Sequence, residues 1–307
     1  MYVEKRRVGK SIKYYLVHSY RNEEKVDKIR KYLGLNLSQK QLEQKTKEVE
    51  KIILREISKK SVDVFSFRLS ENQLEKLNKY QKKIEVFHLT KEGWQNFKED
   101  FVFNTNAIEG STIQESEVSK ILKKTKAENE EEIETKGVAK AVEYIKKTKK
   151  DLSLELLLKL HKLCFEGSKS YAGNFRNVNV VIRNSKGEII HSGIPVEKLD
   201  DALKEFIDWY NKNKNKFAPL VLSAIIHNQF ENIHPFQDGN GRVGRLLLNF
   251  ILLKNKYPPI NILLEDRQEY YKTLQEYSKK DKLKPTLDFL LKQYKKTLKK
   301  VATKRKK

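Results

Sequence analysis

Apolar residues recur every three or four positions over most of the chain beyond residue 70, a spacing typical of amphipathic helices. The pattern predicts helices near residues 71–86, 90–108, 114–124, 128–149, 153–166, 196–213, 217–233, 240–255, 266–279 and 284–301. Ser70 is suited to cap the first of them, and Thr112 with Glu115 fits a capping box at the third. The fold class expected from this pattern is mainly α.

Two regions follow a different pattern. Residues 2–33 contain short β-rich runs that predict a small β-meander, followed by a helix over 38–60 and a further strand at VDVFSFRL. Between Tyr171 and Pro195, two β-branched runs flank NSKG and predict a hairpin. A lone hairpin is stable only when it packs on something, so it either fills a gap in the core or covers a cleft.

These patterns divide the chain into four segments. We expect a basic β-rich and helical module over residues 1–62, a helical region over 63–150, a helical core over 151–294 and a basic tail over 295–307. The beginning of the chain lacks the apolar run of a signal peptide, which favours the cytoplasm. The single cysteine, Cys164, excludes an internal disulfide and a cysteine metal cluster.

The net charge of +23 is concentrated at the two ends. Residues 1–60 hold 17 basic and 8 acidic residues, and residues 295–307 hold 8 basic residues and no acidic one. Such runs are usually solvated surface, and they also suit salt-sensitive contact with nucleic acid or another anionic surface. Both interpretations of the ends remain open.

The stretch HPFQDGNGRVGR, from His234 to Arg245, concentrates the candidate chemistry. Pro235 disfavours helix at the residue before it, so the preceding helix should end near His234, and a new helix should begin after DGNG. A glycine-rich loop that leads into a helix N-terminus presents free backbone N–H groups, which bind anions such as phosphate. Gly239 and Gly241 allow close approach, and Asn240 tolerates left-handed geometry.

The side chains of this stretch fit phosphate chemistry. Arg242 and Arg245 share a face of the new helix and can fork onto phosphate oxygens. Asp238 is a hard oxygen ligand suited to Mg²⁺, and His234 can accept a proton near neutral pH. Base, metal ligand, backbone cradle and cations are the parts of phosphoryl-type transfer. A metal role for His227, two helical turns before His234, lacks a third ligand in the sequence.

The stretch resembles the signature of the Fic (filamentation-induced-by-cAMP) family, and all the fixed positions of that signature are met. The resemblance extends over about residues 150–292. It includes the stretches YAGNFRNVNVVI, WYNKNKNKFAPLVLSAIIHNQFENI, LLLNFILLKNKYPPINI and DRQEYYKTL. It implies a Fic-type helical bundle with a hairpin flap, and AMP transfer from ATP to a hydroxyl of a target protein. It also implies site roles: His234 as base, Asp238 for Mg²⁺, Gly239, Asn240 and Gly241 as anion hole, and Arg242 and Arg245 on the distal phosphates.

The same resemblance gives roles to residues outside the motif. The hairpin corresponds to a flap that aligns the extended segment of the target, with Val181, Ile182, Ile190 and His191 as contacts. Tyr270 and Tyr271 match a pair that lines the nucleotide pocket, and two core tyrosines on a helix are the alternative. Ser278 stands where the family often has Asn, so no nucleotide contact is expected there.

The stretch TNAIEG, Thr105 to Gly110, resembles the inhibitory motif of the family. By that resemblance Glu109 would form a bidentate pair with Arg245 and occupy the arginine that should hold the γ-phosphate. In relatives the same glutamate also aligns a water that removes AMP. The sequence thus predicts an autoinhibited, Mg²⁺- and ATP-dependent protein adenylyltransferase of the class with an N-terminal inhibitory helix. A nucleotide-sensing DNA- or RNA-binding regulator, a pure scaffold and a homodimer remain open.

Overall fold

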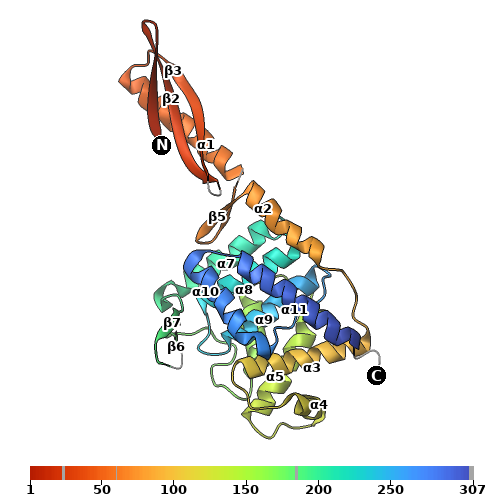
Figure 1. Cartoon of the computed structure of the whole chain (residues 1–307). Coiled ribbons are helices and arrows are strands. Elements are labelled where there is room, and N and C mark those ends of the chain that lie inside the picture. Colours follow the sequence, from red (N-terminus) through yellow and green to blue (C-terminus); the bar gives the residue numbers. More distant parts are fainter. Residues whose placement is uncertain (23–24, 60, 184–185, 304–307) are drawn as a thin grey trace. The chain divides into compact units, whose positions relative to one another are not determined.

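A computed structural model describes residues 1–22, 25–59, 61–183 and 186–303. The chain forms two compact units, Met1–Leu77 and Asn78–Lys307 (Figure 1). The predicted segment boundaries at residues 62, 150 and 294 stay predictions.

The first unit is built on the predicted β-meander. Strands β1 (Tyr2–Val8), β2 (Ser11–Asn22) and β3 (Lys25–Leu35) form an antiparallel sheet in the order β1-β2-β3. Helix α1 (Gln39–Lys59) covers one face of it, because alternate strand residues and one helix face are apolar. Tyr14, Leu16 and Leu33 from the sheet and Ile53 from the helix form the core of this unit.

The segment that links this sheet to the next helix differs from the prediction. VDVFSFRL forms two strands, β4 (Ser61–Val64) and β5 (Phe67–Ser70), instead of one, because the chain turns at Phe65, which adopts a left-handed conformation with φ of 50°. Ser70 caps α2 (Glu71–Asn78) as predicted, since its Oγ accepts from the backbone N–H of Gln73 at 3.2 Å. The expected helix over 71–86 ends early and continues as a short 3₁₀ helix, η1 (Lys79–Lys83).

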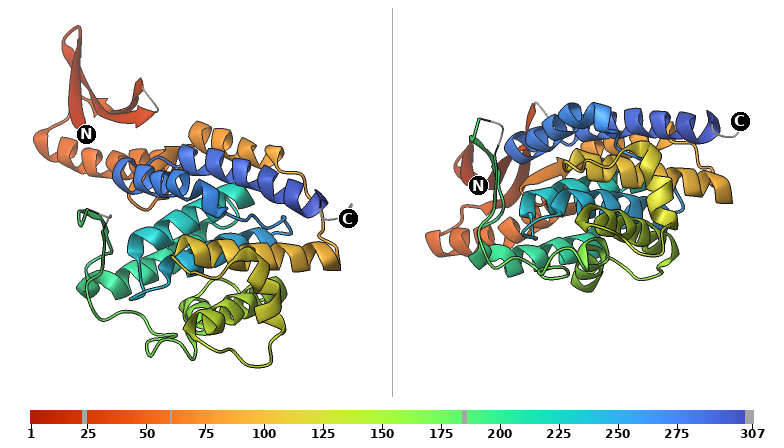
Figure 2. Two further views of the ribbon diagram at one scale, coloured as in Figure 1. Left: turned by 60° about the horizontal axis from the view of Figure 1, so that its bottom comes forward. Right: turned by 90° about the horizontal axis from the view of Figure 1, so that it is seen from below.

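The second unit is helical, as predicted. Its α-helices are α3 (Lys91–Ile108), α4 (Glu115–Lys123), α5 (Glu130–Lys147), α6 (Leu154–Phe165), α7 (Leu199–Asn213), α8 (Pro219–Ile233), α9 (Asn240–Lys254), α10 (Arg267–Lys280) and α11 (Lys284–Thr303). Two further 3₁₀ helices, η2 (Val196–Lys198) and η3 (Leu264–Asp266), precede α7 and α10. Most residues of α8 and α9 are buried, and the other helices of the unit surround this pair (Figure 2).

Two local predictions in this unit have different outcomes. The hairpin between α6 and α7 is confirmed as β6 (Val181–Arg183) paired with β7 (Ile189–Ser192), although its expected NSKG turn includes residues 184–185, outside the described residues. The capping box predicted for Thr112 and Glu115 is wrong. The box lies two residues later, where Glu117 accepts from the backbone N–H of Gln114 at 2.8 Å. The Thr112 hydroxyl donates to Glu131 instead, at 2.6 Å.

Candidate functional site

The junction between α8 and α9 has the predicted helix–loop–helix form. His234 ends α8 in a left-handed conformation, with φ of 53°, so the chain turns out of the helix at this residue. Gly239 starts α9 with φ of 80°, and a Cβ at this position would collide with the ring of Phe165. Glycine is therefore required at this turn for two reasons, its backbone conformation and its close approach to α6.

The loop between the helices is closed by hydrogen bonds from Asn240 and His161. Asn240 accepts from the backbone N–H of Phe236 at 2.9 Å and donates to its carbonyl at 2.8 Å. The His161 ring stacks on the Phe236 ring, with centroids 3.9 Å apart. Since His161 Nδ1 accepts from Gly173, its Nε2 donates to the Asp238 carbonyl, 3.1 Å away. Burial lowers the pKa of His161 to about 4, which keeps this ring neutral.

His234 has the state that a general base requires. Its Nδ1 lies 3.3 Å from the carbonyl oxygen of Glu231. A carbonyl can only accept, so Nδ1 carries the proton and Nε2 keeps its lone pair. Burial lowers the pKa of His234 to about 4, and the imidazole is neutral near pH 7. A neutral ring with a free Nε2 can take a proton from a hydroxyl group.

Asp238 is the half-exposed carboxylate of the loop. Its Oδ1 accepts from the backbone N–H of Gly239 at 2.6 Å, while half of its side chain remains exposed. A carboxylate of this kind can hold Mg²⁺ together with phosphate oxygens and water. The residues covered by the structure contain no group of three metal-ligating side chains, so a cation here would depend on oxygens from its ligand.

Arg245 and Glu109 form the predicted pair, with a different geometry. Arg245 is buried, and its Nη2 lies 2.7 Å from Oε1 of Glu109, the residue that ends α3. The contact is a single hydrogen bond and not the bidentate pair that was expected. The same Nη2 also donates to the Thr105 carbonyl at 3.0 Å, and Nε donates to the Thr105 hydroxyl at 2.7 Å. The Glu109 carboxylate also lies against Gly241, where a Cβ would collide with it. It therefore covers the N-terminus of α9, where an anion would bind.

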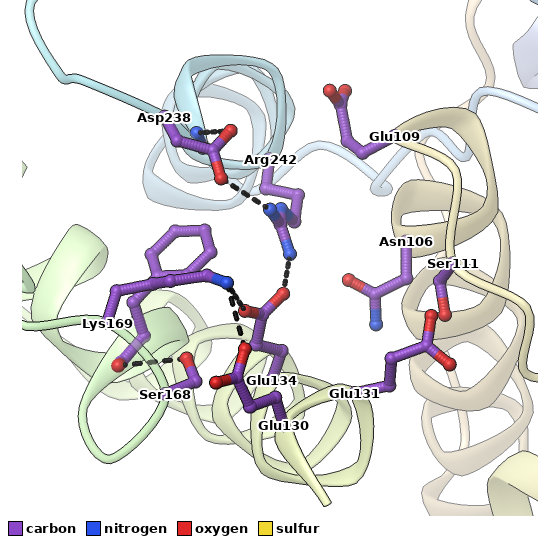
Figure 3. Close-up of polar contacts among 12 residues, drawn as sticks. Asn106, Glu109, Ser111, Glu130, Glu131, Glu134, Ser168, Lys169, Asp238 and Arg242 are labelled. Carbon is purple, nitrogen blue, oxygen red and sulfur yellow. Dashed lines mark hydrogen bonds and ion pairs between the residues drawn. The ribbon is translucent and has the colours of Figure 1, made fainter.

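Arg242 has its own carboxylate partner, Glu134 of α5, which the sequence did not indicate. Its Nη1 donates to Glu134 Oε2, and its guanidinium lies 4.3 Å from the centroid of the Phe165 ring. Figure 3 shows Arg242 between Glu134 and Asp238, with Lys169 on the far side of Glu134. Both arginines of the motif thus contact acidic residues from other helices.

Glu231 adds a second carboxyl group near Arg245. Burial raises the pKa of Glu231 to about 8, and the proximity of Arg245 opposes this shift only in part. Its Oε1 and the Nδ1 of His227 both lie beside Gly244, and neither has a hydrogen-bond partner within the described ranges. Near pH 7 Glu231 is therefore mostly protonated and adds little negative charge to the site.

Arg176 connects the hairpin to the loop. It donates to the carbonyls of Val178 at 2.8 Å and His234 at 2.7 Å, and also to that of Ile194. The hairpin thereby lies next to His234, and the His191 ring centroid is 5.8 Å from that of His234. Arg176 fixes both the root of the hairpin and the backbone of the candidate base.

The remaining predicted site residues are distributed between this surface and the core. Val181 and Ile182 of β6 are exposed, with 45% and 38% of their surface accessible. Tyr270 is buried, and its hydroxyl lies 3.0 Å from Nε2 of His227. Tyr271 is less buried and donates to the carbonyl of Ile108 at 3.2 Å, one residue before Glu109.

The site also includes residues that the sequence did not single out: Glu134, His161, Phe165, Arg176 and Glu231. Arg176 lies in NFRNVNV, where an arginine among β-branched residues was a weak signal. The other residues lie on regular helical patterns and resemble ordinary surface or core positions.

A neutral histidine, a helix N-terminus that follows a glycine-rich loop and a flanking hairpin form a site suited to phosphate-containing ligands. Residues 151–252 match the sequence profile of the Fic/DOC family, so the chain carries a Fic/DOC family domain. It is 28% identical over 199 residues to a protein adenylyltransferase Fic of Nematostella vectensis, covering 62% of this chain and 45% of that protein. It is 29% identical over 188 residues to the protein adenylyltransferase fic-1 of Caenorhabditis elegans, covering 57% of this chain and 35% of that protein.

The fold also matches solved structures. A Fic-domain-containing signaling protein from Bacteroides thetaiotaomicron superposes with a TM-score of 0.61 and 24% sequence identity, covering 75% of this chain and 97% of that one. The Fic-type helical architecture is therefore confirmed. No helix in the described part of the chain has the length and apolar character needed to cross a membrane.

Proposed function

We propose that this chain is a protein adenylyltransferase that transfers AMP from ATP to a hydroxyl side chain of a target protein. The observation that carries the proposal is the neutral His234, which lies between an anion-binding helix N-terminus and an exposed hairpin edge. The names of the curated relatives support the same activity.

In the proposed reaction the target hydroxyl attacks the α-phosphorus of ATP. Its proton moves to Nε2 of His234 as the new P–O bond forms, and the bond to the β-phosphate oxygen breaks to release pyrophosphate. Backbone N–H groups around Gly241, with Arg242 and Arg245, would bind the phosphates. Asp238 would hold Mg²⁺, which would neutralise charge on the phosphates. Exposed Val181 and Ile182 would pair with an extended target segment along β6.

Glu109 would inhibit this reaction. It contacts Arg245 and lies against Gly241, so it occupies the place of an anionic ligand at the start of α9. Two negative groups cannot share this place without strong repulsion. The same carboxylate would align a water for removal of AMP from a modified target, which makes the reverse hydrolysis part of the proposal.

The test is transfer of label from α-labelled ATP to protein in the presence of Mg²⁺. Glu109→Gly should raise transfer about a hundredfold, which corresponds to ~2.7 kcal/mol of barrier height. Glu109→Gly/His234→Ala should lose transfer but still bind ATP, because the base contributes to chemistry more than to binding. Glu131→Gly is the matched control, since its carboxylate binds Thr112 and not an arginine of the site.

Glu109→Gly and Glu109→Gly/His234→Ala test different parts of the proposal. Equal labelling of wild type and Glu109→Gly would contradict the inhibitory role. Full labelling by the double variant would contradict the assignment of His234 as base. If host lysate provides no labelled protein with any variant, the AMP-transfer activity itself is wrong.

Nucleic-acid contact through the first unit is a second candidate function, favoured by the side chains on one face of its sheet. Arg6 and Arg30 both bind Glu4, at 2.6 and 3.0 Å, and remain half-exposed. Arg6 lies 5.6 Å from the ring centroid of Tyr15, which lies 5.4 Å from that of Tyr32. Cations interleaved with aromatic rings suit a phosphate backbone and its bases.

Binding of a labelled DNA duplex, followed by fluorescence anisotropy, tests this second function. Arg6→Ala/Arg30→Ala should weaken binding and flatten its salt dependence. Lys45→Ala, on the surface of α1, is the control. Equal binding by the three proteins would contradict a role of this face. The homodimer and the cytoplasmic location stay predictions from the sequence.

A further inference from the structure

The two arginines of the motif have carboxylate partners that differ in how firmly they are held. Glu109, the partner of Arg245, ends helix α3 and precedes Gly110, which has φ of 98°. Glu109 therefore stands where a helix gives way to a turn. Glu134 lies inside α5, several residues from either end. The backbone of a residue inside a packed helix cannot shift without displacing the helix.

Helix α5 is fixed against α6 at this level. Gly137 lies so close to α6 that a Cβ would stand 2.5 Å from the carbonyl oxygens of Leu163 and Cys164. The next residue of α6, Phe165, carries the ring that faces the guanidinium of Arg242. Glu134 and Phe165 therefore hold Arg242 from two helices that are in direct backbone contact.

The charges around Arg242 show what this arrangement prevents. The side chains of Arg242 and Glu134 are 8% and 13% exposed, whereas that of Asp238 is 50% exposed. Arg242 Nη2 and Asp238 Oδ2 form an ion pair at 3.7 Å, which is too long for a hydrogen bond, so Asp238 is the carboxylate with which the guanidinium would form a hydrogen-bonded pair if Glu134 were lost. Such a pair would occupy the one loop carboxylate that suits a metal ion. Lys169, 3.6 Å from Glu134 and 3.0 Å from Glu130, neutralises the acidic side of the cluster (Figure 3).

We propose that Glu134 is a positioning residue for nucleotide binding, which holds the Arg242 guanidinium against Phe165 and beyond hydrogen-bonding distance of Asp238. The inference rests on the proposed adenylyltransferase function and assigns Glu134 the opposite effect to Glu109. Loss of Glu109 frees an arginine for phosphate, whereas loss of Glu134 misplaces one. Arg242 Nε is buried and has no hydrogen-bond partner among the residues described.

The test measures ATP binding in a protein that cannot turn it over. In a Glu109→Gly/His234→Ala parent, isothermal titration calorimetry gives the Kd for ATP with Mg²⁺. Adding Glu134→Gln, which keeps the shape but removes the charge, should raise this Kd about tenfold. Adding Glu130→Gln is the matched control, because Glu130 is one turn away on the same helix and binds Lys169 but not Arg242. It should leave the Kd unchanged.

A second readout separates positioning from folding. Glu134→Asp should recover part of the affinity, and the melting temperature of each variant shows whether the fold is intact. An unchanged or lower Kd with Glu134→Gln, in a protein that melts like its parent, would overturn the positioning role. If Glu134→Gln melts at a lower temperature than its parent, Glu134→Asp takes its place, provided that this variant melts like the parent. Its Kd then decides the question in the same way. A parent that binds no ATP would contradict the proposed function itself, and the role of Glu134 with it.

Discussion

Single side chains maintain the loop between α8 and α9, and Asn240 contributes most to its closure. It is 2% exposed, and its amide makes both hydrogen bonds to the backbone of Phe236. A buried polar group that loses its partner costs about 1–3 kcal/mol, and two such groups would be left here. The geometry of this loop thus depends on a residue whose side chain has little freedom to contact a ligand.

We therefore expect Asn240→Ala to lower the free energy of unfolding by about 2–4 kcal/mol, because two backbone groups of Phe236 lose their partners. Urea denaturation followed by circular dichroism measures the change. Asn255→Ala is the control, since the Asn255 amide makes one bond, to the carbonyl of Ile251 at 2.8 Å, and the residue is exposed. A loss no larger than that of the control would show that the loop closes without Asn240.

At the residue scale, the sequence predicted the groups that share one short motif. His234, Asp238 and Arg245 lie on one short helix–loop–helix junction, so their proximity could be predicted from local geometry. The pair of Arg245 with Glu109 came from a resemblance to the family and not from spacing. Glu134 lies on an amphipathic helix among Glu130, Glu131 and Glu132, and only the packing of α5 beside α9 distinguishes it from these neighbours.

At the scale of whole elements, the side chain of Arg176 connects the hairpin region to the loop between α8 and α9. Arg176 is 5% exposed and donates to carbonyl groups on both elements. Burial lowers the pKa of this guanidinium, yet arginine remains charged at any physiological pH. Its planar fork can bridge carbonyls in several directions, which the ammonium of lysine cannot reproduce.

We expect Arg176→Lys to reduce AMP transfer by Glu109→Gly at least tenfold with little change in ATP affinity. The physical reason is that the hairpin and His234 lose their common anchor, whereas the arginines of α9 do not contact Arg176. Transfer rates and calorimetry on the same protein give both quantities. Arg183→Lys, on the exposed part of the hairpin, is the control. A parallel loss of transfer and of ATP affinity would contradict this division of roles.

Helices were predicted correctly where the apolar pattern extends over many residues. Predictions failed where one or two residues determine a cap or a turn. The helices of the second unit were located to within a few residues, because each buries a continuous apolar stripe. The capping box at α4 was misplaced by two residues, since Gln114 and Glu117 compete locally with Thr112 and Glu115. The strand at VDVFSFRL was really a hairpin, because nothing in its composition indicates a left-handed Phe65.

The charge of the whole molecule is unevenly distributed, and some lysines of the basic tail form ion pairs with acidic residues. Lys296 of α11 binds Glu265 at 2.5 Å and Asp266 at 2.5 Å. Burial alone would raise the pKa of Asp266, but hydrogen bonds from Gln293, Lys296 and Lys292 lower it to about 2. Lys300 lies 3.4 Å from Glu115. The part of the tail seen in α11 therefore contacts the second unit, which leaves the sheet of the first unit as the better candidate for an anionic partner.

Stability of the whole molecule should depend on pH with a maximum near pH 6.5, because buried groups change their protonation on unfolding. Burial lowers the pKa of His161, His227 and His234 to about 4, so below pH 6.5 the unfolded chain gains protons that the folded one does not, and stability falls toward pH 4. Burial raises the pKa of Glu231 to about 8. The contribution of this group to stability is therefore complete below pH 4.5 and is lost as the pH rises to 8. Below pH 6.5 the effect of the three histidines on stability outweighs that of Glu231, and above pH 6.5 the effect of Glu231 remains alone. Each group changes the free energy of unfolding by about 1.4 kcal/mol per pH unit.

Urea denaturation from pH 4.5 to 8.5 measures the profile. Glu231→Gln should abolish the alkaline decline and keep the acid one, whereas an unchanged alkaline limb would mean that Glu231 is ionised in the folded protein.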